Sequence, residues 1–148
     1  MDQVDHSIVE CLLGDGRATY AQVGKVVGLS VAATKRRIDC LVRTQVIRGF
    51  TAVVDSRVLG WNLEAHVSLY TTGTVPYATV RRDLEAVPEV VEAFTVTGAP
   101  DTRVHVVAGD AVHLEKVIGR LRTLPYVQQT DTTLLLSRLL QRSHARPT

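Results

Sequence analysis

Two helix-capping residues define a pair of short helices in the first third of the chain. Thr19 and Gln22 fit a capping box, in which each side chain accepts from the other residue's backbone N–H. Gly28 is suited to end that helix and Ser30 to cap the next one. Gly24 lies in the first of the two helices, where a Cβ would hold the pair apart. Two short helices joined by a glycine-containing turn predict a helix-turn-helix.

Apolar periodicity sets the buried face of each helix. A preceding helix is expected over residues 4–13, capped by Asp2. In the helix after Thr19, the residues expected to face inward are Val23, Val26 and Val27. The helix after Ser30 carries an apolar face made of Val31, Thr34, Ile38, Leu41 and Val42. At about 100° per residue, its opposite side carries Ala32, Ala33, Arg36 and Arg43, with Lys35 and Arg37 on the flanks.

Positive charge is concentrated in this part of the chain. The net charge is only +2, yet residues 17–48 contain seven lysines and arginines and a single acid, Asp39. Residues 58–148 are balanced. Concentrated basic charge is typical of a nucleic-acid-binding segment, although a solvated helical face would give the same pattern. Together with the helix-turn-helix it predicts binding to double-stranded DNA.

The basic residues of the third helix have different expected roles. Arg36 is the best candidate for reading a base edge, since a guanidinium bonds bidentately to guanine; a phosphate contact is an equal alternative. Lys35 and Arg43 are expected to contact phosphate. Arg37 either contacts phosphate or pairs with Asp5 inside the domain, and we favour the internal pair.

The small residues at the start of that helix allow close approach to DNA. The methyl groups of Ala32 and Ala33 can meet thymine methyl groups in the major groove. Ser30 could present the helix N-terminus to a phosphate, although capping alone explains this residue.

The hydrophobic period changes near Gly60. Before it, residues 46–54 are rich in β-branched side chains and are expected to form a strand or hairpin. Beyond it, strands and helices are expected in the order βαββαβ, over residues 63–71, 76–86, 90–96, 103–108, 110–124 and 127–136. This order is that of a ferredoxin-like unit.

The expected fold class is therefore α+β. A three-helix winged helix-turn-helix domain is expected over residues 1–50, followed by a β-strand linker over 51–60. A ferredoxin-like domain for effector binding and oligomerisation is expected over 61–140, with a flexible tail over 141–148.

Alternation along the strands predicts two different sheet faces. The side chains expected to pack on the helices include Ala65, Val67, Leu69, Val104 and Val106. Those expected on the opposite face include His66, Ser68, Tyr70, His105 and Val107. A face that carries Tyr70 and Val107 is too apolar for exposure, which predicts sheet-on-sheet dimerisation. His66 and His105 would be neighbours there and could make assembly sensitive to pH.

The chain lacks the features of a membrane or metal protein. No apolar run approaches the ~20 residues of a spanning helix, and the N-terminus does not resemble a signal peptide. A cytoplasmic, nucleoid-associated protein is therefore expected. Cys11 and Cys40 fit no metal spacing and are expected to be buried, reduced thiols. The histidines show no ligand spacing either, so neither a metal nor a cofactor is expected.

Catalytic motifs are also missing. The chain has no nucleophile elbow, no phosphate-binding glycine loop and no HExxH run. Asp101 and His105 could form a catalytic pair, but nothing near them supplies a third member, so the chain is not expected to be an enzyme. Two alternatives remain: a small dimeric enzyme built on a ferredoxin-like sheet, and an architectural protein that packs DNA with low specificity.

The sequence resembles the leucine-responsive/AsnC (feast/famine) family of transcription regulators. The residues that carry the resemblance are Asp5, Ile8, Asp15-Gly16-Arg17, Val23-Gly24, Val27-Gly28-Leu29-Ser30, Arg37-Ile38, Leu41, Ile47 and Gly49-Phe50. The second half is similar to the family's amino-acid-sensing domain in the order and spacing of its elements. The resemblance covers about residues 2–137.

This resemblance implies DNA binding by homodimers, their assembly into higher oligomers such as an octamer, and control by a small effector, usually an amino acid. The positions that match the family's effector site are Gly98, Ala99, Pro100, Asp101, Thr130 and Thr132. In the family, this loop usually reads Gly, acid or Asn, aromatic, Asp, so Ala99 and Pro100 depart from the pattern. Gln45, just after the third helix, stands where the family usually has glycine.

Overall fold

The computed structural model describes residues 1–140, and these form two compact units, Met1–Val53 and Val54–Leu139. The boundary falls inside the predicted linker. Each unit has its own hydrophobic core and is described by itself. The tail predicted for residues 141–148 lies outside the described residues.

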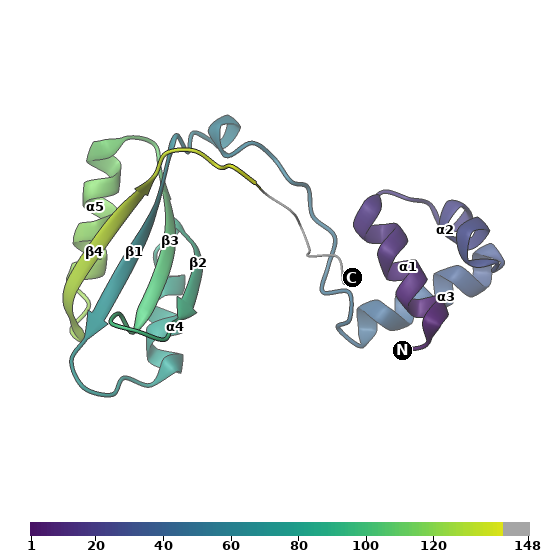
Figure 1. Ribbon diagram of the computed structural model, residues 1–148, viewed down its shortest axis with the longest axis horizontal. Coiled ribbons are helices and arrows are strands. Elements are labelled where there is room, and N and C mark those ends of the chain that lie inside the picture. Colours follow the sequence, from purple (N-terminus) through teal and green to yellow (C-terminus); the bar gives the residue numbers. More distant parts are fainter. Residues whose placement is uncertain (141–148) are drawn as a thin grey trace. The chain divides into compact units, whose positions relative to one another are not determined.

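The N-terminal unit contains three helices, α1 (Gln3–Gly14), α2 (Tyr20–Val27) and α3 (Val31–Arg43) (Figure 1). The predicted caps are confirmed: the side chains of Asp2, Thr19 and Ser30 each accept from a backbone N–H in the first turn that follows. The second cap is a complete capping box. The buried side chains of Ile8, Val23, Ile38 and Leu41 form the core between the helices.

Close contact between α2 and α3 depends on Gly24, as predicted. A Cβ at this position would lie 2.7 Å from the carbonyl oxygen of Leu29 and 2.8 Å from Oγ1 of Thr34. Thr34 is fully buried, and its hydroxyl donates to the carbonyl of Ser30 at 2.9 Å. The absent side chain therefore allows the turn and the start of α3 to pack directly on α2.

Three inward positions were predicted wrongly. Val26 and Val31 are 71% and 53% exposed, because α2 contacts the core through Val23 and Val27 while Val31 begins α3 beyond that contact. Cys40, expected to be buried, lies on the exposed side of α3, whereas Cys11 is half-buried.

The strand or wing predicted after α3 is absent from the described residues. Residues 47–55 have no regular secondary structure, and a short 3-10 helix, η1 (Ser56–Leu59), follows. A strand requires a hydrogen-bonded neighbour, and no described strand pairs with this segment. The β-branched composition that predicted a strand instead leaves exposed apolar side chains, among them Phe50, Val53 and Val54.

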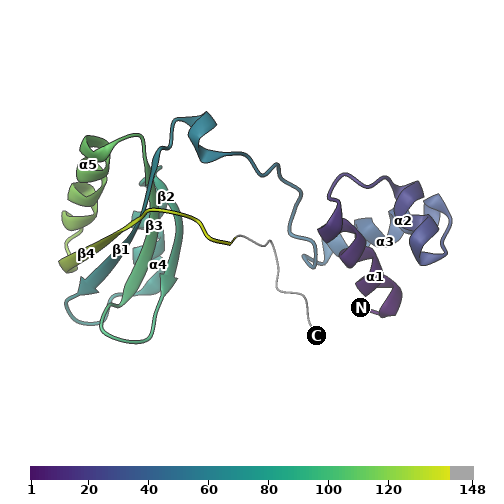
Figure 2. The ribbon, with the colours of Figure 1, turned by 45° about the horizontal axis from the view of Figure 1, so that its top comes forward.

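The C-terminal unit is a four-stranded antiparallel sheet with two helices on one face (Figures 1 and 2). Its elements are β1 (Leu63–Thr71), α4 (Tyr77–Glu85), β2 (Val90–Thr95), β3 (Thr102–Ala108), α5 (Ala111–Arg122) and β4 (Val127–Leu135). The strand order is β2-β3-β1-β4. The predicted βαββαβ order is confirmed, with each boundary within two residues of its expected place.

The core of this unit lies between the sheet and the helices. Ala65, Val67 and Leu69 of β1 are fully buried, as are Val104 and Val106 of β3. They pack with Leu84 from α4 and with Val117 and Leu121 from α5. The alternation predicted for β1 and β3 is therefore confirmed on the helix side. Ser68 and Val107, predicted on the opposite face, are also buried in the single chain, so Val107 is not an exposed apolar residue there as expected. No helix covers that opposite face (Figure 2).

Candidate DNA and effector sites

The exposed side of α3 presents the residues predicted to contact DNA. The side chains of Lys35, Arg36 and Arg43 are exposed and line an open depression on the helix surface together with Ala32. Ala33 is half-buried. Arg36 makes no hydrogen bond or ion pair with any other residue of the described part of the chain. Its guanidinium is therefore available to an external acceptor.

Lys35 is paired within its own helix. Its Nζ lies 2.6 Å from Oδ2 of Asp39, and both side chains are more than half exposed. The hydrogen bond that Lys35 donates to Asp39, assisted by the negative charge of that carboxylate, raises the pKa of Lys35. A phosphate would have to compete with this surface carboxylate, which holds the ammonium only weakly in water. The i,i+4 spacing of the two residues was visible in the sequence, but the pair was not predicted.

Arg37 takes the internal role that we favoured from the sequence. Its Nη1 donates to Oδ2 of Asp2 and to Oδ1 of Asp5, both at 2.8 Å. The Asp5 carboxylate accepts one hydrogen bond from the backbone N–H of Asp2 and one from the guanidinium of Arg37. Both hydrogen bonds lower the pKa of Asp5, that from Asp2 the more. Arg37 thus connects α3 to the start of α1, and its guanidinium is already engaged.

Ser30 is the N-cap of α3. Its Oγ accepts from the N–H of Ala33 at 3.3 Å, and its carbonyl accepts from both the N–H and the hydroxyl of Thr34. These contacts fix where α3 begins and therefore which residues of the helix are exposed.

The loop predicted to bind an effector connects β2 and β3. Gly98 has φ of 118°, which glycine adopts without strain. Asp101 attaches the loop to β1: its N–H donates to the carbonyl of Leu69 at 3.0 Å, and its Oδ2 accepts from the N–H of Thr71 at 2.8 Å. The backbone amide of Asp101 and one carboxylate oxygen therefore already have partners.

The two threonines lie on β4, on the other side of β1. Thr130 pairs with Leu69 and Thr132 with Val67, which places both threonine side chains on the face toward the helices. Oγ1 of Thr130 accepts from Nε of Arg122 at 2.8 Å. Arg122, in the last turn of α5, was missed by sequence reasoning; the short connection from α5 to β4 was the available signal.

The predicted effector residues do not enclose one pocket within a single chain. The loop meets β1 from the β3 side and Thr130 meets it from the β4 side, so they are two strand spacings, or ~10 Å, apart. The structure thus places these residues near Leu69 without bringing them into mutual contact.

Metal-binding clusters and membrane-spanning helices are both absent from residues 1–140. Residues 1–140 contain no group of three or more His, Cys, Asp or Glu side chains arranged to hold a metal ion. None of the helices in those residues combines the length and apolar character that crossing a membrane requires.

A helix-turn-helix with an exposed basic helix, joined to a βαββαβ unit, defines a two-domain DNA-binding regulator. Residues 1–42 match the AsnC-type helix-turn-helix domain, and residues 64–145 match the Lrp/AsnC ligand binding domain. The chain belongs to the Lrp/AsnC family of transcription regulators.

Named relatives and solved structures match this chain along nearly its whole length. HTH-type transcriptional regulator Rv2324 of Mycobacterium tuberculosis is 42% identical, and the match covers 96% of both chains. The structure of the feast or famine regulatory protein Rv3291c from M. tuberculosis, complexed with L-methionine, is 28% identical with a TM-score of 0.90 and 99% coverage of each chain. Escherichia coli AsnC is 26% identical, with a TM-score of 0.87 and 97% coverage of each.

These matches establish the function in outline. The protein is a DNA-binding transcription regulator with a C-terminal ligand-binding domain, and it is not an enzyme. The enzymatic alternative raised by the ferredoxin-like fold is therefore rejected.

Proposed function

We propose that this regulator recognises specific double-stranded DNA through the exposed side of α3. In this proposal Arg36 reads a base edge, while Lys35 and Arg43 contact phosphates. Ala32 and Ala33 allow the helix to approach the groove closely. The observation that carries the proposal is the exposed, unpaired guanidinium of Arg36 among small residues and further basic side chains.

The alternative is low-specificity DNA packing, and salt dependence separates the two. The experiment measures binding to DNA that flanks the protein's own gene and to random duplexes of equal length, from 50 to about 300 mM salt. A specific regulator should bind the flanking DNA at least ~10³-fold more tightly at physiological salt. Equal affinities with the same salt slope would favour the architectural alternative.

Ser30 and Arg37 are secondary in this proposal. Ser30 could bring the N-terminus of α3 to a phosphate, whereas Arg37 acts through the position of α3, because its Nη1 is held by Asp2 and Asp5. Arg37→Ala should therefore lower the stability of the N-terminal unit as well as DNA affinity. Loss of affinity with unchanged stability would instead indicate a phosphate contact.

Homodimers, and larger assemblies such as an octamer, are proposed to form through the C-terminal unit. The helix-free face of the sheet supports this, because apolar side chains such as Phe94 (54% exposed) and Leu135 (36%) remain exposed on it. Sheet-on-sheet packing would cover them. In a single chain the effector residues lie on both sides of β1, which is consistent with a site completed by another subunit.

The proposed effector site consists of Gly98, Ala99, Pro100, Asp101, Thr130 and Thr132. The related protein Rv3291c was solved with L-methionine, which supports an amino acid or a similar molecule as the class of ligand. Two of the four loop residues cannot donate a backbone N–H to a carboxylate: Pro100 has none, and that of Asp101 is bonded to Leu69. Ordinary amino acids should therefore bind weakly, and the true effector should differ from them or be larger.

Calorimetric titration with the twenty amino acids tests the effector proposal. A micromolar dissociation constant, near −8 kcal/mol, for any of them would refute it. If none binds, the combined substitution Ala99→Asp and Pro100→Tyr should restore measurable affinity. If that variant does not bind an amino acid either, the weak binding would be due to β4 or to the assembly and not to the loop.

The function proposed here also implies a place in the cell. A protein that binds DNA specifically should colocalise with the nucleoid in the cytoplasm. Fluorescence imaging of a tagged chain tests this, and a uniform distribution that is unaffected by α3 substitutions would argue against it.

A further inference from the structure

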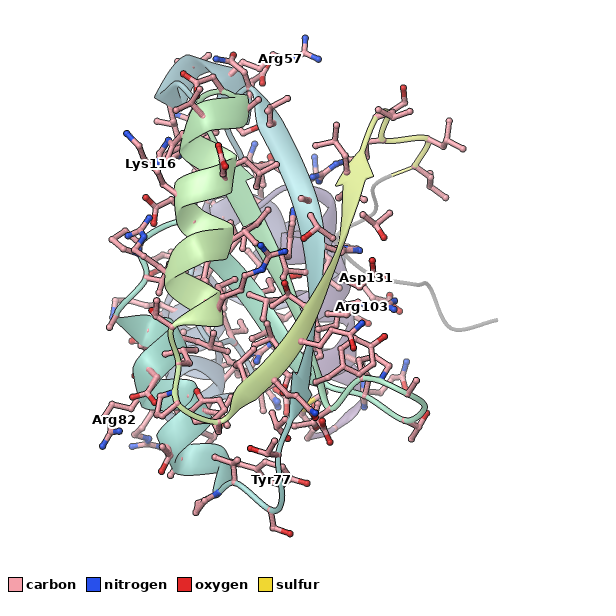
Figure 3. All side chains as sticks on the ribbon, turned by 90° about the vertical axis from the view of Figure 1, so that its left-hand side faces the viewer. Arg57, Tyr77, Arg82, Arg103, Lys116 and Asp131 are labelled. Atoms are coloured by element: carbon pink, nitrogen blue, oxygen red, sulfur yellow. The ribbon has the colours of Figure 1, made fainter. Side chains whose placement is uncertain are left out.

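A cluster of titratable side chains lies on the helix-free face of the sheet. Figure 3 shows Arg103 and Asp131 on the side of the sheet that faces away from α5. Residues directly opposite each other on paired strands share a face, so register places the other members beside them. The face carries Glu64 and His66 from β1, Glu92 from β2, Arg103 and His105 from β3, and Asp131 from β4.

The two histidines are direct cross-strand neighbours. His66 pairs with His105, and their ring centroids are 5.3 Å apart in an edge-on arrangement. Nε2 of His105 lies 3.1 Å from Oε2 of Glu64, and the same oxygen accepts from Arg138 at 2.6 Å. His105 therefore has a carboxylate partner, which it shares with an arginine.

His66 lacks such a partner among the described residues. Partial burial lowers its pKa, and the nearby charges of His105 and Arg103 lower it further, while Glu92 and Glu64 act in the opposite direction. On the β4 side its paired residue is Thr133, which carries no charge, with Asp131 one pair further along. A protonated His66 would therefore lie beside His105 and Arg103 without a carboxylate in hydrogen-bond contact.

The same face is suited to a second copy of the chain. Arg103, Glu92 and Asp131 form no ion pair with another residue in the described part. In a two-fold contact each copy would offer charges of both signs to the other, and the apolar rim that contains Phe94 and Leu135 would be covered. These features match an isologous interface better than a partner of a single charge sign.

We infer that this face joins two copies of the chain only while His66 is neutral, so that acidification weakens the assembly. The inference rests on the proposed dimer and adds its regulation. A second copy would remove water from His66, and a desolvated imidazolium beside the Arg103 guanidinium and without a carboxylate partner is unfavourable. Assembly would thus lower the pKa of His66 below its value in the single chain.

The sign of the pH dependence follows from that difference. If assembly lowers the pKa of His66 further, the stability of the dimer is fully present above the single-chain pKa, which itself lies below the usual histidine value. It is lost as the pH falls through that value. Each dimer contains two copies of His66, so the dissociation constant can rise by as much as ~100-fold per pH unit in that range.

Sedimentation of the full-length chain at pH 7.5, 6.5 and 5.5, at constant ionic strength, tests the inference. The dissociation constant of the wild type should rise at least about tenfold across this range. His66→Gln, which cannot be protonated, should remove most of that rise. The matched control is His6→Gln, a substitution of an exposed histidine in the N-terminal unit, which should behave like the wild type. Circular dichroism at each pH checks that every variant stays folded.

The possible results separate this inference from the proposals on which it rests. A pH-independent wild type, or an equal rise in His66→Gln, would refute control by His66 and leave the dimer intact. A monomer at every pH would refute the dimer as well, while DNA binding is measured independently. If His66→Gln does not fold, the imidazole resonances of the wild type decide the matter. The pKa of His66 should be lower in concentrated than in dilute protein, and equal values would overturn the inference.

Discussion

Replacing Gln45 by glycine should stabilise the N-terminal unit. Gln45 directly follows Thr44, the C-cap of α3, and has φ of 59°, the one positive value at a residue other than glycine within residues 1–140. In this region a Cβ crowds the following carbonyl oxygen and costs ~1–2 kcal/mol. The conformation is imposed by the end of the helix: Gln45 donates its N–H to Val42, and Val46 and Ile47 donate theirs to Leu41.

Three contributions set the size of the effect. Glycine removes the strain of ~1–2 kcal/mol. It also gives the unfolded chain more conformational freedom, which offsets about 0.5 kcal/mol of that gain. The exposed hydrogen bond from Nε2 of Gln45 to the Val42 carbonyl, 3.3 Å long, is also lost, at a cost of about 0.5 kcal/mol or less. Taken from the middle of that strain range, the net gain should be about 0.5–1 kcal/mol.

Native-state hydrogen exchange measures this gain in the full-length chain. The amides of Ile38 and Leu41 lie in the core turns of α3 and report opening of the N-terminal unit. Their exchange should slow by about two- to fivefold in Gln45→Gly. Gln45→Ala keeps the Cβ and should give no gain, and Thr44→Gly, at an ordinary φ of −85°, should speed exchange. Equal protection in Gln45→Gly and Gln45→Ala would refute the strain argument.

Two further substitutions test the packing and electrostatics of the two units. Gly24→Ala should destabilise the N-terminal unit by about 1–3 kcal/mol, because the backbone oxygen of Leu29 cannot move easily; Gly14→Ala, in open space, is the control for the same exchange experiment. Burial alone would raise the pKa of Glu89, but hydrogen bonds from Arg120 and His113 outweigh it and hold the pKa at about 2. The C-terminal unit should therefore lose about 3 kcal/mol as the pH falls from 4.5 toward 2, and Glu89→Gln should remove that loss. Urea unfolding followed by fluorescence of the single tryptophan measures it, and an unchanged slope in the variant would contradict the assignment.

Local signals in the sequence predicted most of the regular structure. The caps at Asp2, Thr19 and Ser30 involve residues within three positions of each other, so short-range pattern was sufficient. The same holds for the alternation along β1 and β3. Because Gly24 has no side chain, its role could be read from its place in a helix that must pack closely on another.

Features that depend on distant or absent partners were not predicted. Residues 46–54 have β-forming composition, but composition does not supply the neighbour that a strand needs. The contact of Arg122 with Thr130 and the attachment of Asp101 to β1 depend on which strands are adjacent in the sheet. The buried Glu89, bonded to His113 and Arg120, likewise joins segments that are separate in the sequence.

The most direct test of the account compares Arg36→Ala with Lys35→Ala in DNA binding. Fluorescence anisotropy is measured on the flanking DNA and on random duplexes over a range of salt, with Lys116→Ala on the outer side of α5 as a control (Figure 3). Arg36→Ala should cost about 1–3 kcal/mol on the specific site and relax its specificity at one position. Lys35→Ala should weaken both DNAs alike and reduce the salt slope by about one. Full affinity in the double variant Lys35→Ala/Arg36→Ala would contradict the assignment of α3 as the recognition helix.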